Sequence, residues 1–341
     1  MTSRELVHKT LEFANYHDRA PRDMGCLPWA VNTYPDEVNA LLRDYPSDFT
    51  GPAIACKEKG IAQGNPYEIG DSIDDWGCRF TNVQRGVHGQ VKEPIISPDD
   101  EDWEDTSRVH IPAEWLSFEI DDVNNFCAST DKFVFAGCCP RPFEQLQFIR
   151  GTEQLFMDMA VRPPGLLKFL DTMHLFYCDL LEKWAKTGID ALLFMDDWGT
   201  QRDLLINPQT WVEIFKPMYK DYIAIAHGAG KKIFMHSDGN ILAIYPHLIE
   251  LGLDAINSQI FCMGIENLAP YKGKITFWGE IDRQYLLPKG TPAEIDKAVT
   301  NVYNNLWQSG GCIAQCEFGP GAKPENVRQV FAGWDALTNR R

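Results

Sequence analysis

Short apolar stretches alternate with longer amphipathic stretches from Lys132 onward. The short stretches end at turn residues and predict buried strands, which are FVFAG, DALLFMDDWG, KKIFMHSDG, LDAINSQ, KITFWGE and CIAQCEF. The longer stretches carry apolar residues at helical spacing, and Pro164–Gly188 begins with proline and ends with glycine, as helices commonly do. This alternation predicts a parallel sheet with right-handed crossovers.

The same pattern favours a closed (β/α)8 TIM-type barrel over an open doubly wound sheet. No glycine-rich phosphate loop follows any of the predicted strands, as an open nucleotide-binding sheet would require. Residues 1–130 are irregular, with helices expected near Ser3–Phe13 and Asp36–Tyr45, and residues 131–341 hold the regular repeats. We therefore expect an α/β fold in which residues 1–341 form a single barrel with an N-terminal helical and loop extension.

Composition and charge narrow the class of protein. The formal net charge of -16 argues against a nucleic-acid partner, because phosphate binding needs a concentrated basic surface. We find neither an apolar run long enough to cross a bilayer nor the apolar centre of a signal peptide, so we expect a cytoplasmic protein. The ten cysteines include no C-x-x-C pair, and most are expected to be small buried hydrophobic residues.

Polar side chains collect where the predicted strands end, which is the active face of a barrel. They are Asp196, Asp197, His236, Asp238, Gln259, Cys262, Glu280, Asp282, Cys316 and Glu317. Taken singly, each has an ordinary structural interpretation: His236 a hydrogen-bonded residue, Asp196 a helix cap and Cys316 a packing residue. Taken together, an imidazole, a carboxylate and a thiolate on one rim can form a tetrahedral zinc site with one open position.

Several of these segments also resemble a known family. FAGCCPRPFEQLQFIRG, FMDDWGTQRDLLINPQTWVEIF, IFMHSDGNI, WGEIDRQYLLPKGTPAEI and KPENVRQVF are similar, in this order, to the uroporphyrinogen decarboxylase superfamily. The resemblance implies a single TIM-type barrel. It favours the branch of methyltransferases that act with corrinoid or coenzyme M partners, because no arginine-rich MRQAGR segment, which grips the porphyrinogen in true decarboxylases, occurs between Ala20 and Thr50.

The resemblance also implies a metal site. Zinc methyltransferases of this type carry H-x-C and a later cysteine, and here His236 and Cys316 stand at the outer positions with Asp238 in place of the first cysteine. Glu280 is a candidate fourth ligand. The candidate catalytic residues are Asp196, Asp197 and Asp75, and the candidate substrate-binding residues are Asp74, Trp76, Trp198, Gln259 and Trp278.

The function expected from this set is zinc-dependent transfer of a methyl group from a methyl ether or methylamine. A site with few thiolates is a strong Lewis acid, which suits a poor leaving group. The chain holds no D-x-H-x-x-G corrinoid motif, so cobalamin is expected on a separate partner protein. The sequence leaves the oligomeric state open, with a homodimer as one option. It also leaves three other functions open: a metal-independent decarboxylase or lyase that uses Asp196 and His236, a non-catalytic binding barrel, and porphyrinogen decarboxylation.

Overall fold

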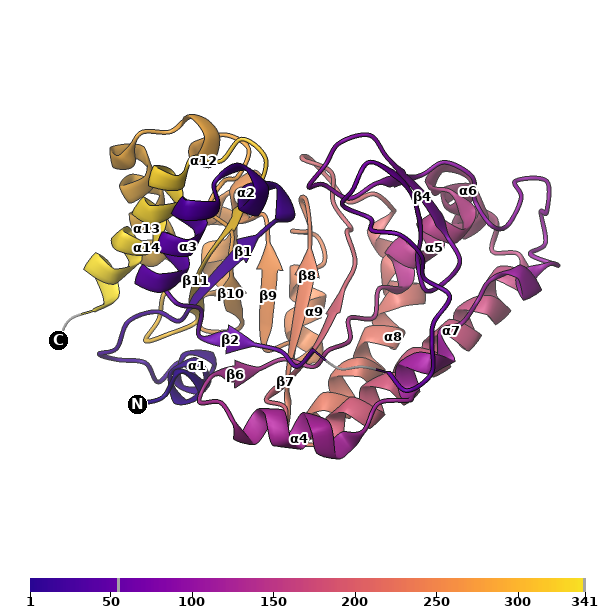
Figure 1. Cartoon of the computed structure of the whole chain (residues 1–341), viewed down its shortest axis with the longest axis horizontal. Coiled ribbons are helices and arrows are strands. Elements are labelled where there is room, and N and C mark those ends of the chain that lie inside the picture. The colour runs from indigo at the N-terminus through magenta and orange to yellow at the C-terminus, as the bar shows by residue number, and fades with distance from the viewer. Residues whose placement is uncertain (54–55, 340–341) are drawn as a thin grey trace.

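The computed structural model describes residues 1–53 and 56–339, and its centre is a curled parallel sheet (Figure 1). Six strands lie in the order β1-β11-β10-β9-β8-β7, a pair β2-β6 lies beside them, and β3-β4-β5 form a separate antiparallel sheet. The strands are β1 (Arg22–Cys26), β2 (Phe49–Thr50), β3 (Gly70–Ile73), β4 (Arg79–Asn82), β5 (Gln90–Val91), β6 (Phe133–Val134), β7 (Ala191–Met195), β8 (Lys232–Ser237), β9 (Ala255–Ser258), β10 (Thr276–Trp278) and β11 (Cys312–Phe318).

Backbone hydrogen bonds link the β2-β6 pair to both edges of the six-stranded sheet. The Asp48 amide donates to the Arg22 carbonyl at 2.9 Å, next to β1, and the Ala136 amide donates to the Ala191 carbonyl at 2.9 Å, next to β7. The short pair therefore lies between the two edge strands of the sheet.

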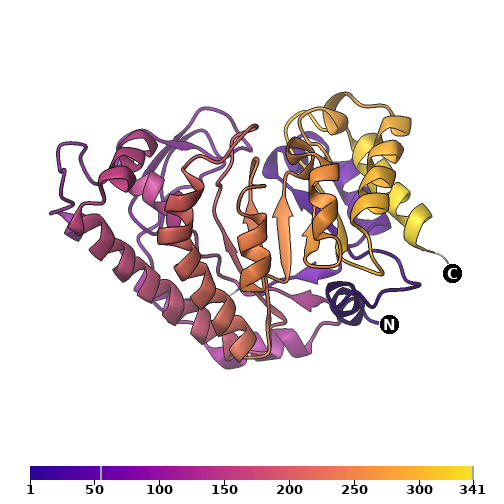
Figure 2. The same ribbon diagram turned by 180° about the vertical axis from the view of Figure 1, so that it is seen from behind.

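Helices cover the outer face of the sheet, and the two longest, α7 and α8, run side by side (Figure 2). None of the helices in the described part of the chain is both long and apolar enough to span a membrane. The α-helices are α1 (Ser3–Leu11), α2 (Pro28–Thr33), α3 (Pro35–Asp44), α4 (Ile120–Ala128), α5 (Pro142–Arg150), α6 (Thr152–Val161), α7 (Pro164–Ala185), α8 (Pro208–Gly228), α9 (Tyr245–Leu251), α10 (Ile260–Met263), α11 (Ile265–Leu268), α12 (Leu286–Lys289), α13 (Pro292–Leu306) and α14 (Pro324–Thr338), and the 3-10 helices are η1 (Thr106–Arg108), η2 (Ala113–Leu116) and η3 (Ala269–Tyr271).

Toward the N-terminal ends of its strands, the concave face of the sheet is filled by an apolar layer, which we call the interior layer. Its buried members come from the strands and from α1, and they are Val7, Leu11, Phe49, Phe133, Ala191, Phe234, Ala255 and Ile313. Because side chains alternate between the two faces of a strand, this layer fixes which positions face inward along each strand. Positions two and four residues beyond a member of the layer point to the same interior.

The structure confirms the predicted strands from β6 to β11 and departs from the prediction in the N-terminal third. Strands β1 and β2 lie in the part expected to be irregular. The segment RDMGC of β1 has no apolar run, and β2 is only two residues long, so neither carries a strand pattern. After β6, the helical stretch is divided into α5 and α6 at Gly151, whose φ of 81° interrupts the helix.

The interior layer predicts a large stability effect at Phe234. This residue is fully buried and its ring lies 5.7 Å from that of Phe133. Substitution Phe234→Ala should lower the free energy of unfolding by about 3 to 5 kcal/mol because it leaves a cavity in a packed layer. Urea denaturation measures this, with Val83→Ala, at a residue that is 85% exposed, as the control. An equal effect of the two substitutions would contradict this packing.

Candidate functional site

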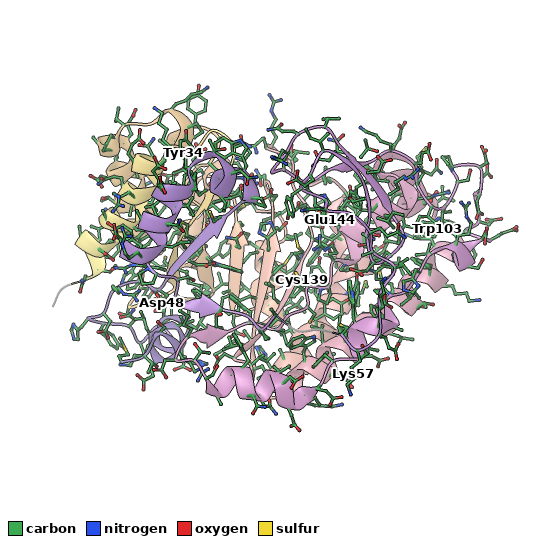
Figure 3. The ribbon with its side chains drawn as sticks, in the orientation of Figure 1. Tyr34, Asp48, Lys57, Trp103, Cys139 and Glu144 are labelled. Carbon is green, nitrogen blue, oxygen red and sulfur yellow. The ribbon has the colours of Figure 1, made fainter. Side chains whose placement is uncertain are left out.

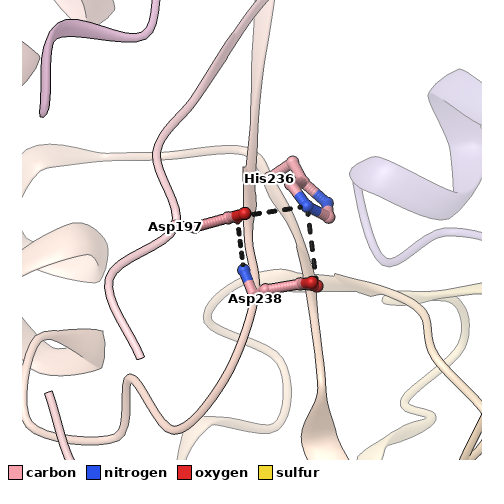
Figure 4. Close-up of side chains that lie close together, drawn as sticks. All are labelled: Asp197, His236 and Asp238. Carbon is pink, nitrogen blue, oxygen red and sulfur yellow. Dashed lines mark hydrogen bonds and ion pairs between the residues drawn. The ribbon is translucent and has the colours of Figure 1, made fainter. Parts of the chain in front are cut away.

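Asp197, His236 and Asp238 converge where β7 and β8 end (Figure 4). The Nε2 atom of His236 lies 3.5 Å from Oδ1 of Asp197 and 3.7 Å from Oδ1 of Asp238. The Asp238 amide also donates to Oδ1 of Asp197 at 3.0 Å. His236 and Asp238 point inward because they follow Phe234 at steps of two residues, and Phe234 belongs to the interior layer.

Two glycines allow the loops after β7 and β8 to approach this closely. A Cβ atom on Gly239 would lie 2.1 Å from the carbonyl oxygen of Gly199, and one on Gly199 would lie 2.4 Å from the amide of Asn240. Gly239 also has a φ of 78°, a conformation that favours glycine. The Gly199 amide donates to the Asp238 carbonyl at 3.0 Å, so the two loops are joined at the point where they carry the site carboxylates.

A chain of hydrogen bonds orients the imidazole of His236. Its Nδ1 lies 2.5 Å from Oδ1 of Asn257, and the Asn257 amide group donates to the Trp278 carbonyl. The Trp278 indole N–H donates in turn to Asp23 at 2.9 Å. Since the amide oxygen of Asn257 can only accept, Nδ1 carries a proton and donates to it. Nε2 therefore faces the two aspartates, where it can carry the second proton of the charged ring or, in the neutral ring, offer its lone pair to a metal ion.

The carboxylates change the proton affinity of the imidazole. Burial alone would lower the pKa of His236, but the hydrogen bond and charge of Asp197, followed by Asp238 and Glu280, raise it to about 9. Burial likewise favours a higher pKa for Asp197, yet the contact with His236 holds it below its usual value. The group therefore has a strong affinity for positive charge, whether a proton or a metal ion.

One guanidinium contacts Asp238 of this group and two further carboxylates beside it. Arg283 donates from Nη1 to Glu317 at 2.8 Å, from Nη2 to Asp238, and its Nε lies 3.6 Å from Glu280. Burial first, and then the charges of Asp238 and Glu317, raise the pKa of Glu280 to about 7, although Arg283 opposes the shift. Positive charge from Arg283 thus allows this many carboxylates to share one rim.

The donor set fits a divalent metal ion. Asp197, His236 and Asp238 each offer one ligand atom, these atoms all lie within 4.8 Å of one another, and no second such group occurs among the described residues. Oδ1 of Asp238 is buried without a hydrogen-bond partner, and so is Oε2 of Glu280 on the same rim. Imidazole and carboxylate ligands are those of catalytic zinc sites.

The structure does not bring Cys316 to this group. Ile313 on β11 belongs to the interior layer, so Gln315 and Glu317 face the interior while Cys316, at odd spacing, faces the helices. Cys316 is 0% exposed, and its burial raises the pKa of the thiol well above its usual value. Glu280, by contrast, lies close enough to act on the charge of His236, although it stands outside the group of three.

Asp196 and Trp198 lie on the outer side of β7, away from Asp197. Asp196 is 0% exposed, and it accepts from the Tyr219 hydroxyl at 2.6 Å and from the Glu144 amide at 2.8 Å. Burial raises the pKa of Asp196 well above its usual value. Trp198 is stacked on Phe143, with ring centroids 3.9 Å apart. Both residues attach β7 to its surrounding helices, and neither reaches the interior.

The predicted loop residues Asp74, Asp75 and Trp76 line a cavity of about 280 Å³ together with Arg141. Asp74 accepts from the amides of Trp76 at 3.0 Å and Cys78 at 2.7 Å, which closes a tight turn. Trp76 is 1% exposed and is mainly a packing residue. Burial raises the pKa of Asp75 and of Asp74.

The remaining predicted residues lie on the β9 and β10 side. Gln259 accepts from Gln201 at 3.2 Å and lines a cavity of about 260 Å³ with Glu280 and Arg283. Trp278 faces the interior, where its ring stacks on Phe135 at 5.5 Å.

Sequence reasoning missed four residues of this region. Asn257 contacts His236 and Arg283 contacts Asp238, two members of the candidate metal-binding trio Asp197, His236 and Asp238, which we call the metal group. Arg141 pairs with Glu144 at 3.1 Å at the start of α5. Glu144 lies in the first turn of α5, after β6 (Figure 3). It is near enough to act on the charges of Asp197 and His236. Asn257 could have been found from its position, because it lies inside a predicted strand and pairs in register with His236. Arg141 and Glu144 carry no such signal.

Comparisons with known proteins bear on the family and the fold of this chain. The family model described as uroporphyrinogen decarboxylase (URO-D) matches residues 74–335. A methyltransferase from Methanosarcina mazei has a similar fold, with a TM-score of 0.69 at 12% sequence identity over 99% of this chain and 99% of that chain. A glycoside hydrolase family 10 endo-beta-1,4-xylanase from Gloeophyllum trabeum has a TM-score of only 0.46 at 11% identity, covering 96% of this chain and 99% of that chain. No curated protein matches the sequence.

The contact between the two loops predicts a specific effect of Gly239→Ala. The added methyl group would collide with the Gly199 backbone, so the substitution should separate Asp238 from Asp197 and lower the thermal midpoint of unfolding. The matched control is Gly230→Ala, since Gly230 has a similar φ of 68° and open space around its Cβ position. Both variants carry the left-handed backbone strain of about 1 to 2 kcal/mol. Equal thermal midpoints of the two variants would contradict this contact.

The charges around His236 predict its titration in protein stripped of metal. Its imidazole should titrate near pH 9, and Asp197→Asn should lower this value because it removes the strongest favourable partner. A raised pKa in the folded state stabilises the fold below pH 6.5, and this stabilisation should be lost as pH rises through 9. Proton NMR of the ring measures both titrations, with Asp221→Asn on the surface as the control. A midpoint unchanged by Asp197→Asn would refute this assignment.

Proposed function

Because the chain belongs to the uroporphyrinogen decarboxylase family, as an enzyme that resembles a methyltransferase, we propose that it transfers a methyl group with the help of a bound zinc ion. The methyl donor in this proposal is a small methyl ether or methylamine. The acceptor is a corrinoid carried by a separate protein that docks over the mouth of the sheet.

We also infer that the curled sheet closes into an eight-stranded barrel. The hydrogen bonds from Asp48 to Arg22 and from Ala136 to Ala191 support this closure, because they join the short pair β2-β6 to both edges of the sheet. In a closed barrel the C-terminal strand ends surround one mouth. Asp197, His236 and Asp238 then stand at the mouth, where a docked partner can reach them.

The observation that carries the proposal is the convergence of Asp197, His236 and Asp238 on one point. Three protein ligands with an open position are typical of catalytic zinc sites. When bound, the zinc ion would supply Lewis acidity to the heteroatom from which the methyl group leaves. Two carboxylates and one imidazole would hold it, with Asn257 fixing the ring of His236.

The residues around the metal group would act on the leaving group, which keeps an electron pair and takes up a proton. An acceptor nucleophile attacks the methyl carbon with an electron pair, the bond from that carbon to oxygen or nitrogen breaks, and its electron pair stays on the heteroatom. That heteroatom takes up a proton to give an alcohol or amine. Glu280 is placed to hold this proton, because it is buried, lines the cavity beside Arg283, and has an oxygen without a hydrogen-bond partner.

The proposal predicts the metal content of purified protein. His236→Ala should reduce bound zinc at least tenfold, because it removes one of three ligands and leaves two carboxylates in mutual repulsion. Cys316→Ser should keep its zinc, since Cys316 faces the helices. His227→Ala serves as the histidine control, because His227 pairs with Asp254 away from the group. Mass spectrometry of the metal and methyl transfer to free cob(I)alamin are the two measurements.

The two measurements separate the parts of the proposal. Loss of zinc and of methyl transfer in His236→Ala alone is the expected result. Zinc retained by His236→Ala would refute the metal site. Methyl transfer that survives complete removal of metal would refute the role of the metal.

A further inference from the structure

Arg283 binds one of the two carboxylate oxygens of Asp238. Its Nη2 donates to Oδ2 of Asp238, whereas Oδ1 of the same carboxylate lies 3.7 Å from Nε2 of His236 (Figure 4). Oδ1 is buried and has no hydrogen-bond partner within the described parts of the chain. The two oxygens of Asp238 are therefore divided, because one is held by the guanidinium and the other is free to bind a metal ion.

The turn after β10 holds Arg283 in this place. Oδ1 of Asp282 accepts from the amides of Gln284 at 2.8 Å and Tyr285 at 2.9 Å. The Asp282 carbonyl accepts from the Leu287 amide in α12 at 3.0 Å. These bonds fix the backbone on both sides of Arg283, and its side chain is only 21% exposed. The guanidinium therefore has a defined direction before any metal ion binds.

The same guanidinium engages two more carboxylates beside the metal group. Nη1 of Arg283 donates to Glu317 at 2.8 Å, and Nε lies 3.6 Å from Glu280. The planar fork of a guanidinium suits several carboxylates at once, whereas an ammonium group acts as a single point charge. Without Arg283, both glutamates and the second oxygen of Asp238 would be available to a metal ion. Arg283 therefore limits how many oxygens the rim can offer.

Divalent metal ions differ in how many oxygen ligands they require. Zinc prefers a tetrahedron of ligands, whereas manganese and magnesium prefer an octahedron that is mostly oxygen. The metal group offers one ligand atom from each of its three residues, which suits a tetrahedral ion with one open position. Because affinities follow the same order at most sites, discrimination between such ions depends on the number and geometry of the ligands.

We infer that Arg283 is the positioning residue that makes the metal group selective for zinc. By holding Oδ2 of Asp238, it limits this carboxylate to one ligand atom. By binding Glu280 and Glu317, it keeps further oxygens away from the metal ion. The inference rests on the proposed function for the presence of the metal. It concerns which divalent ion the site takes, and it is independent of the identity of the methyl donor.

The ratio of the manganese Kd to the zinc Kd tests this role. Both ions carry the same charge, so a variant that changes only the electrostatic potential or the stability of the fold moves the two constants together. A variant that frees oxygen ligands favours manganese and lowers the ratio. Competition with a chelator of known affinity, at one pH and with metal-free full-length protein, measures both constants.

Two variants separate ligand geometry from charge. Arg283→Gln should lower the ratio at least about tenfold, because it releases Oδ2 of Asp238 and both glutamates. Glu317→Gln is the matched control, since it removes a charge from the same cluster and leaves the bond from Arg283 to Asp238 in place. Glu317→Gln should leave the ratio unchanged.

A crystal structure of the unmodified protein with zinc tests the same point without a variant. One oxygen of Asp238 should bind zinc while the other still accepts from Arg283. An Asp238 carboxylate that binds zinc through both oxygens would overturn the inference, even when Arg283→Gln does not fold.

The outcomes distinguish this inference from the proposed function. An unchanged ratio in Arg283→Gln, or an equal fall of the ratio in Glu317→Gln, would overturn the role of Arg283 and leave the metal site standing. Unmodified protein that binds neither ion would overturn the metal site and the inference together. A lowered ratio in Arg283→Gln, with no methyl transfer by the unmodified zinc protein, would uphold the inference and contradict the proposed reaction.

Discussion

The hydrogen bond from the Asp238 amide to the carboxylate of Asp197 joins β7 to β8 at the site. It forms because Gly199 and Gly239 let the two backbones touch, and because both strands hold their inward positions on the interior layer. Once the carboxylate is fixed, His236 lies between two acids and its ring is oriented by Asn257 from the other side. The metal group and the electrostatics of the rim follow from this one junction.

Charge at the rim is balanced locally. Four carboxylates, those of Asp197, Asp238, Glu280 and Glu317, lie around one histidine and one arginine. Arg283 neutralises the side toward β10 and β11, which leaves the Asp197 side for a cation. This division explains how an acidic protein can hold a cluster of acids at one rim.

Much of this fold could be predicted from sequence, because the regular strands and helices carry clear periodicity. Strand β8 shows why part of the site could also be predicted. Phe234, His236 and Asp238 follow one another at steps of two residues and so share one face, and this spacing can be seen in the amino-acid sequence. Strand β1 was not predictable, since it has no apolar run and is held by its pairing with β11.

The role expected for Cys316 shows a limit of assuming that all polar residues at the ends of the strands face the same site. Its position next to Glu317 at the end of β11 suggested a ligand, but the parity of the strand turns its thiol to the helices. The face of β11 on which Cys316 lies could have been worked out from Ile313 only after the members of the interior layer were known. Arg141 and Glu144 reach the site through the path of the chain after β6, which local pattern does not encode.

The measurement that tests the metal centre most directly is anomalous diffraction at the zinc edge from crystals grown with zinc. We expect one peak at about 2.0 to 2.2 Å from Oδ1 of Asp197, Nε2 of His236 and Oδ1 of Asp238. A zinc peak bonded to Cys316, or no peak between the two aspartates and the histidine, would contradict it.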